Sequence, residues 1–151
     1  MTEAERDAHL AGLRVCRVGT VGVTGAPHVS ALWYVWDGAV LWLYSLIKSQ
    51  RWVNLLRDPR VSVIVDTGAD YFELRGVEFI GEVEFVGEQP RIGEPNPELE
   101  VPERLFAERY SGGTWLGYDH RHAWLRLRPR KQVSWDFRKL GGTETPFNPN
   151  R

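Results

Sequence analysis

The sequence predicts a mainly β fold, an antiparallel barrel built from six extended segments. Each segment is rich in β-branched and aromatic residues or alternates between apolar and polar positions, as strands do. One short helix interrupts the series and few helices are expected elsewhere, which disfavours a doubly wound parallel sheet with helices on both faces. Glycine, proline and aspartate between the segments suit tight turns that join antiparallel neighbours.

The chain has 151 residues, the length of one domain that buries roughly 68–70% of the surface its unfolded form exposes. We assign residues 1–140 to this domain and residues 141–151, which are polar and rich in glycine and proline, to a loose tail. Cys16 is the only cysteine, the N-terminus carries no export signal, and no apolar run approaches the length of a membrane helix. We therefore expect a cytoplasmic protein without a membrane span.

The first elements are a helix at 2–13 and a β-hairpin. Thr2 is the expected N-cap of the helix, because Glu5 stands three positions later and completes a capping box. The segments 15–23 and 28–36 read as strands, and the intervening Thr-Gly-Ala-Pro sequence breaks them as a turn does.

The next elements are a second hairpin and the inserted helix. The Asp37-Gly38 pair is a strong hairpin signal, and it leads into a strand at 39–45. The helix at 49–56 ends before Pro59, because proline restricts the residue ahead of it and cannot continue the helical hydrogen bonds. The β-branched run at 61–65 predicts a buried strand.

The second half begins with a turn at 67–70 and a long extended segment at 71–86. Gly76 and Gly81 within that segment indicate a bend or bulge where a sheet curls into a barrel. Four of the nine prolines fall in 87–102, which we interpret as a surface loop.

A short helix at 102–110, ended by a Ser-Gly-Gly sequence, and a last strand at 123–135 complete the prediction. Leu125 and Leu127 share one face of that strand. The other face carries Arg126, Arg128 and Arg130. With a formal net charge of −1 and no interleaved aromatic residues, this basic face favours a solvated surface, and no nucleic-acid partner is expected.

The junction between the strand at 39–45 and the helix at 49–56 is the clearest candidate site. The first turn of a helix has unpaired N–H groups and the positive end of the helix dipole, so it favours an anion. Lys48, Ser49 and Arg51 add donors at this point, which predicts a phosphate-binding site. An N-capped helix with two solvated charges is the plainer alternative.

Other chemically active side chains favour structural roles. The seven tryptophans exceed what one core easily hides, which points weakly to a dimer or a planar ligand, and most of them are expected to be packing residues. Burial in the core or a dimer interface, rather than stacking on a ring, is expected for Trp33, Trp36, Trp42 and Trp52. His120 and His122 lack further ligands for a metal and are expected to be solvated loop residues. Cys16 is expected to be a small buried hydrophobe.

Four stretches, at 25–34, 48–60, 74–81 and 134–140, resemble the split-barrel flavin-binding family that includes pyridoxamine 5′-phosphate oxidase. The most specific is Lys48-Ser-Gln-Arg-Trp and the residues that follow it. The resemblance covers nearly the whole chain and is closest to the actinobacterial coenzyme F420-dependent reductases of the B type. It implies a six-stranded antiparallel split β-barrel that binds flavin mononucleotide (FMN) or F420, with a few short helices, in a homodimer with two sites at the interface.

The resemblance also implies which residues bind the cofactor. The strand at 30–33 lies beside the ring, Ser49 and Arg51 hold the phosphate, and Trp135 and Arg138 contact the cofactor, Trp135 from the partner subunit. Gln50 stands where the oxidase has an arginine, which tells against oxidase activity. The full set of cofactor-binding candidates is Ser30, Ala31, Leu32, Trp33, Lys48, Ser49, Gln50, Arg51, Asn54, Arg57, Arg75, Trp135 and Arg138.

The expected function is hydride transfer from reduced F420 to a small organic acceptor. FMN is the alternative cofactor, in an enzyme like pyridoxamine-phosphate oxidase, and a non-catalytic flavin-, F420- or haem-binding protein or an interaction module is the alternative class. No acid or base is identified as catalytic, with Tyr34 or water as the possible proton donor. The acidic F420 tail needs basic residues outside the pocket, for which Lys48, Arg57 or the arginines of 126–130 are candidates. No metal is expected.

Overall fold

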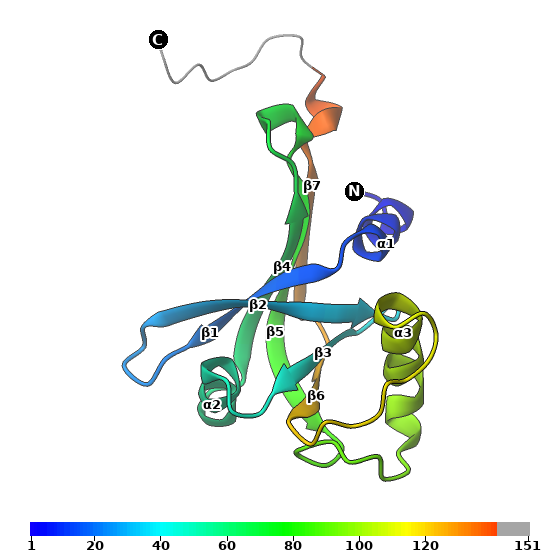
Figure 1. Cartoon of the computed structure of the whole chain (residues 1–151). Helices are drawn as coiled ribbons and strands as arrows, with labels where there is room; N and C mark the ends of the chain where they lie inside the picture. Colours follow the sequence, from blue (N-terminus) through cyan, green and yellow to red (C-terminus); the bar gives the residue numbers. More distant parts are fainter. Residues whose placement is uncertain (142–151) are drawn as a thin grey trace.

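A computed structural model describes residues 1–141 of the chain (Figure 1). The strands are β1 (Val15–Val21), β2 (Pro27–Trp36), β3 (Leu41–Leu46), β4 (Arg60–Thr67), β5 (Arg75–Val86), β6 (His122–Leu127) and β7 (Lys131–Asp136). The α-helices are α1 (Glu3–Gly12), α2 (Gln50–Arg57) and α3 (Glu100–Tyr110), and short 3₁₀ helices are η1 (Tyr71–Glu73), η2 (Pro97–Leu99) and η3 (Phe137–Leu140). All of the predicted tail except Gly141 lies outside the described residues.

Six of the strands form a closed antiparallel barrel. Neighbours follow the order β4-β1-β2-β3-β6-β5, and pairing of β4 with β5 closes the ring. The hairpins predicted at both ends of β2 are present, with Cys16 opposite Leu32 and Val35 opposite Trp42. The predicted mainly β barrel is therefore confirmed.

The predicted last strand at 123–135 is divided, and this is a correction. β6 pairs with the second half of β5, and β7 pairs with the first half of β5 along the same edge. Both β6 and β7 run antiparallel to β5. Arg128–Arg130 bulge out between them, and the Arg130 N–H donates to the Ile80 carbonyl at 2.9 Å. Pro129 lacks an N–H for the ladder, which explains why pairing is interrupted here.

Two more boundaries differ from the prediction. Residues 71–73, expected to be extended, form η1, where the side chains of Asp70 and Glu73 make a capping box. The expected surface loop at 87–102 contains η2 and the start of α3, which begins at Glu100 rather than at Pro102. Proline is compatible with the first turn of a helix, where its missing N–H leaves no bond unmade.

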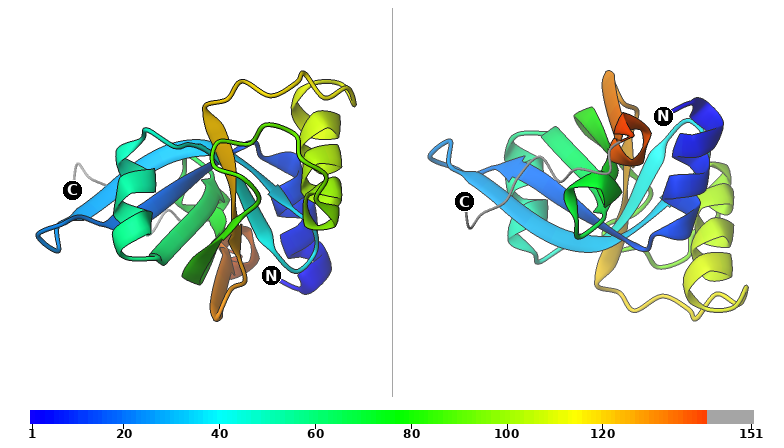
Figure 2. Two further views of the ribbon diagram at one scale, coloured as in Figure 1. Left: turned by 90° about the horizontal axis from the view of Figure 1, so that it is seen from below. Right: turned by 90° about the horizontal axis from the view of Figure 1, so that it is seen from above.

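The helices lie on opposite sides of the barrel. The predicted capping box of α1 is present, with the Glu5 N–H donating to Thr2 Oγ1 at 3.2 Å. Figure 2 shows α2 on one side and α1 beside α3 on the other, where Arg109 of α3 donates to the Leu10 carbonyl of α1 at 2.8 Å. Within residues 1–141, no helix is both long and apolar enough to cross a bilayer.

The core has two layers, because β3 and β6 are buried on both faces. Inward residues such as Leu43 and Leu125 fill the barrel. Outward residues, including Trp42 and Trp124, pack with Leu99 under α3 and the loop that precedes it. The alternation of a strand is thus kept, but each face meets apolar neighbours.

The basic face predicted at 126–130 is solvated only in part. Arg126 forms ion pairs with Glu84 and Glu98, and its side chain is only 14% exposed. Arg128 and Arg130 lie 3.8 and 3.4 Å from carboxylates of β5. Because glutamates neutralise these arginines, the stripe offers little free positive charge to an anionic ligand.

Candidate functional site

The candidate site lies where β2 and β3 separate. β2 pairs with β1 over Pro27–Trp33, but it pairs with β3 only over Tyr34–Trp36. The Tyr34 N–H donates to the Tyr110 hydroxyl oxygen at 3.2 Å. The one proton of that hydroxyl lies between two carbonyl acceptors, Tyr34 at 2.6 Å and Arg14, the residue before β1, at 2.8 Å. The backbone N–H and C=O of Tyr34 thus point toward β1. Since the backbone groups of successive residues in a strand point to opposite edges, those of Trp33 and Ala31 point toward the open side, where β3 has separated. A short unpaired strand edge therefore faces the split.

Arg51 of α2 bridges the split. Its Nε donates to Ser45 Oγ of β3 at 3.1 Å, and its Nη1 donates to Ser30 Oγ of β2 at 2.6 Å. The residue is only 6% exposed, and no carboxylate among residues 1–141 lies within 4 Å of it. Burial lowers the pKa of its guanidinium. A buried cation with only hydroxyl partners is costly, and a bound anion offsets that cost.

A cavity of about 500 Å³ opens beside Arg51. One wall consists of β2 and β3 residues, and the other consists of α3 and the segment 111–122 that follows it. The lining residues are Ala31, Leu32, Trp33, Tyr44, Leu46, Arg51, Phe106, Tyr110, Ser111, Trp115, Leu116, Gly117, Tyr118, Asp119 and His122. The volume is that of a site for a small molecule or cofactor.

The cavity walls are mainly aromatic. Trp33, which is 46% exposed, stacks on Tyr110 with ring centroids 4.3 Å apart and planes 3° apart. Trp33 is thus an exposed wall residue, whereas Trp42 and Trp52 are buried as expected. The Tyr44 hydroxyl and Trp115 Nε1 are buried and have no partner among residues 1–141. Unpartnered polar atoms beside a cavity indicate that their partners come from outside the described chain.

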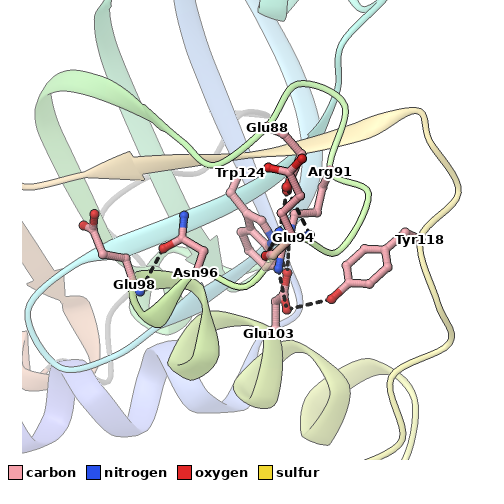
Figure 3. Close-up of polar contacts among 8 residues, drawn as sticks. All are labelled: Glu88, Arg91, Glu94, Asn96, Glu98, Glu103, Tyr118 and Trp124. Carbon is pink, nitrogen blue, oxygen red and sulfur yellow. Dashed lines mark hydrogen bonds and ion pairs between the residues drawn. The ribbon is translucent and has the colours of Figure 1, made fainter.

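A buried ion network fastens the far wall to the barrel (Figure 3). Arg91 pairs with Glu88 and with Glu103 of α3, whose Oε1 lies 2.6 Å from the Arg91 Nε. Glu103 also accepts from the Tyr118 hydroxyl at 3.1 Å and from Trp124 Nε1 at 3.3 Å. Tyr118 lines the cavity, so the network holds the cavity wall against β6.

The α2 N-terminus places three predicted residues near the split. Ser49 caps the helix: its Oγ accepts from the Trp52 N–H at 3.2 Å and donates to the Leu46 carbonyl at 2.8 Å. Lys48 is exposed, and Gln50 is exposed with its amide donating to Asn54 Oδ1 at 2.8 Å. The plainer alternative, an N-capped helix with two solvated charges, is therefore correct for the Ser49 cap. It is wrong for Arg51, which is buried.

Several other predicted site residues lie away from this cavity. Asn54 is buried and donates to Thr20 Oγ1 at 3.0 Å, and Arg57 donates to the Val21 carbonyl at 2.6 Å, so both fasten α2 to β1. Arg75 and Arg138 line a second cavity of about 260 Å³ beside α1. Trp135 packs flat against β5, where a Cβ on Gly76 would collide with its ring. One copy of the chain does not bring these last three residues to Arg51.

Two further predictions have clear outcomes. Cys16 is fully buried, and burial raises its pKa to about 12, so it is a packing residue as expected. The prediction of Tyr34 as a possible proton donor is wrong. Its hydroxyl donates to the Leu10 carbonyl at 2.6 Å, and the side chain is buried in the barrel rather than at the cavity. Burial also raises the pKa of Tyr34.

Sequence reasoning missed the polar pair formed by Asp119 and His122. Asp119 Oδ2 lies 2.6 Å from His122 Nδ1, and both residues line the cavity. The interpretation of His122 as a solvated loop residue is wrong, since it begins β6 and stacks on Tyr44. The Asp-His-Arg-His sequence was the available signal, but the pairing with β3 is not visible in it. No group of three metal-ligating side chains occurs within the described part of the chain.

Known proteins share this architecture. The chain is 37% identical to the conserved hypothetical protein Rv2991 from Mycobacterium tuberculosis, with a TM-score of 0.78 over 98% of this chain and 92% of that one. An F420 reductase is 23% identical, with a TM-score of 0.63 over 84% and 94%. The haem storage protein HutZ from Vibrio cholerae is 17% identical, with a TM-score of 0.68 over 87% and 92%. The last two likenesses concern the fold alone.

No curated protein matches the chain. The family described as pyridoxamine 5′-phosphate oxidase matches residues 1–111, a stretch that includes β1 to β5, the split and Arg51. The chain therefore belongs to the pyridoxamine 5′-phosphate oxidase family.

Proposed function

We propose that this protein is a reductase that uses F420 to deliver hydride to a small organic acceptor. The observation that carries the proposal is the buried Arg51, which faces an aromatic cavity without a carboxylate partner among residues 1–141. A cofactor phosphate supplies the missing anion, and each charge-assisted hydrogen bond to it is worth about 1.5–3 kcal/mol.

The residues around the split suit a planar cofactor. The unpaired backbone groups of Ala31 and Trp33 provide donors and acceptors for the polar edge of a ring, and the apolar walls exclude water from it. A bound deazaflavin or flavin supplies the hydride chemistry. The chain's own contribution is to hold the phosphate at Arg51 and to position an acceptor beside the ring.

The choice of F420 over FMN rests on the α2 N-terminus. Gln50 replaces a positive charge that the oxidase has at its phosphate site, while the exposed Lys48 remains free to meet an acidic tail. The F420 reductase of similar fold is consistent with this choice. The arginines of 126–130 are already paired with glutamates, so Lys48 is the better candidate for the tail.

We also propose that two copies form a homodimer in the cytoplasm, as expected from the sequence. Trp135 and Arg138 belong to the cofactor-binding set only if they approach the cavity of another copy. Their separation from Arg51 within one chain is consistent with a site that two copies share.

Cofactor titration tests the proposal. Purified protein is titrated with F420 and with FMN by equilibrium dialysis, and reduced F420 is then mixed with quinones and enones while its absorbance is followed. We expect F420 to bind more tightly and to be reoxidised faster with protein than without it. Tighter FMN binding would identify the alternative cofactor, and binding of neither would contradict the proposal.

Arg51→Ala tests the phosphate position, with Arg57→Ala as the matched control on the same helix. Loss of one or two charge-assisted bonds should weaken cofactor binding by about 10- to 100-fold, whereas the control should bind like the native protein. Equal affinity of the Arg51 variant and the control would show that the phosphate lies elsewhere.

A non-catalytic haem-binding protein is the second candidate. His122 offers an imidazole nitrogen in an aromatic cavity, and HutZ, a haem storage protein, has a similar fold. Haem titration with an absorbance readout separates the two candidates. A tight complex whose spectrum changes in a His122 variant, together with no reoxidation of F420, would favour this candidate.

A further inference from the structure

The loop before β6 forms an acid–base pair at the cavity. Asp119 accepts hydrogen bonds from the N–H groups of Arg121 at 2.9 Å and His122 at 3.1 Å. Although its partial burial acts in the opposite direction, these bonds and the His122 ring lower the pKa of Asp119. The carboxylate is therefore ionised at neutral pH and acts as acceptor, so Nδ1 of His122 is the donor in their 2.6 Å contact.

The His122 ring is held in place on its face as well as at its edge. It stacks on Tyr44, with centroids 4.9 Å apart, and Tyr44 in turn stacks on Trp124 at 4.6 Å. The backbone is fixed too, because His122 lies opposite Leu46 in the β3–β6 ladder. The other nitrogen, Nε2, has no partner among residues 1–141 and is accessible at the cavity. The ring thus presents one free nitrogen in a fixed orientation.

The surroundings of His122 contain charges of both signs. Its own loop contributes Asp119 and Arg121, and β3 contributes the Tyr44 hydroxyl. The backbone N–H of Arg91 donates to the His122 carbonyl, and the Arg91 side chain pairs with Glu88 and Glu103. The Tyr118 hydroxyl and Arg51 lie on the same cavity. Of these, Asp119 is the anion in direct contact with the ring.

We propose that His122 is the proton donor of the reductase, with Asp119 as its positioning residue. This inference rests on the proposed function. When bound, the reduced deazaflavin would supply hydride to the electrophilic carbon of an acceptor such as an enone, and the π electrons of the acceptor would move onto its carbonyl oxygen. The Nε2–H bond of the imidazolium breaks, and its proton forms the O–H bond of an enol. The neutral ring then regains a proton from water.

His122→Phe tests the donor, since phenylalanine keeps the stack on Tyr44 and lacks the proton. His120→Asn is the matched control, because His120 is exposed on the same loop and asparagine tolerates its φ of 59°. We expect kcat for an enone to fall by about 100-fold or more in the His122 variant, with unchanged F420 affinity, and the control to match the native protein. A kcat equal to that of the control would overturn the proposal.

Asp119→Asn tests the positioning residue. Loss of the carboxylate weakens the bond that fixes the ring, so kcat for an enone should fall by about 10-fold or more with unchanged F420 affinity. In protein without cofactor, the NMR signal of the His122 Nδ1–H should lose the downfield shift that a short hydrogen bond to a carboxylate gives. An unchanged Nδ1–H signal would contradict the pairing.

The two sets of measurements separate this inference from the proposed function. Native protein that binds no F420 would refute the reductase proposal and, with it, the proton-donor role. Native protein that reduces enones while His122→Phe retains its kcat would refute the inference alone. Because the NMR measurement needs no cofactor, it decides on the Asp119–His122 pair in either case.

Discussion

Arg51 combines a structural role with the binding role proposed for it. Its guanidinium joins the two strands that diverge at the split, through hydroxyls of Ser30 and Ser45. Hydroxyls satisfy its hydrogen-bonding groups but do not neutralise its charge, so burial of Arg51 costs free energy in the protein without a ligand. The binding role proposed for Arg51 therefore comes at the expense of stability.

A double variant measures this cost. Arg51→Met with Ser45→Ala removes the charge together with the buried hydroxyl that accepts from the Arg51 Nε. We expect the ligand-free variant to gain about 1 kcal/mol or more in free energy of unfolding, measured by urea denaturation, and to lose cofactor binding. Arg104→Met, a control with an exposed side chain on α3, should change stability by less than about 0.5 kcal/mol. A clear loss of stability in the double variant would show that Arg51 holds the split together.

At the scale of elements, the network around Arg91 determines how firmly the far cavity wall is held. Arg91 is 3% exposed and lies over the Tyr118 ring, 5.1 Å from its centroid. Removal of one partner from a buried ion pair leaves the other charge uncompensated. We therefore expect Arg91→Met to destabilise the protein by about 3 kcal/mol or more, measured by urea denaturation, with Arg104→Met on the exposed face of α3 as the control. A loss no larger than that of the control would contradict a stabilising role.

The same network predicts a dependence on acid. Burial of Glu88 opposes ionisation, but its bonds to Arg91 outweigh this and lower the pKa of Glu88. The stabilisation from this carboxylate is complete above its unfolded pKa of about 4.3 and is lost as pH falls through the lower folded value. Aromatic circular dichroism should therefore show the cavity wall loosening below about pH 4.3, and Glu88→Gln should remove this pH dependence. An unchanged transition in that variant would assign the effect to another carboxylate.

Elements set by local patterns could be predicted, and those set by distant contacts could not. The Asp37-Gly38 turn, the Thr2 cap and the helix after Ser49 each carry their signal within a few residues. The interruption at Arg128–Arg130 depends on how β5 passes from one partner to the next, which no local pattern records. For the site, the split and Arg51 were recognisable from motifs, whereas His122 becomes a wall residue only through β3.

At the scale of the whole molecule, the sharing of each site between two copies is open to a direct test. We propose that Arg51 of one copy and Trp135 of another serve the same cofactor. Mixing and refolding Arg51→Ala with Trp135→Ala should then restore about a quarter of the native high-affinity sites in a titration, because each mixed dimer contains one intact site. No recovery, with dimers confirmed by sedimentation, would place Trp135 outside the site.

The segment after α3 has a consequence for how such proteins diverge. It supplies Trp115, Tyr118, Asp119 and His122 to the cavity, and it follows the stretch at 1–111 that the family match covers. Residues 111–119 lie outside the barrel strands and α2, so we expect their exchange to leave the residues proposed to hold the cofactor in place. Grafting residues 111–119 between relatives of the same fold should therefore change the preferred acceptor while cofactor affinity stays the same.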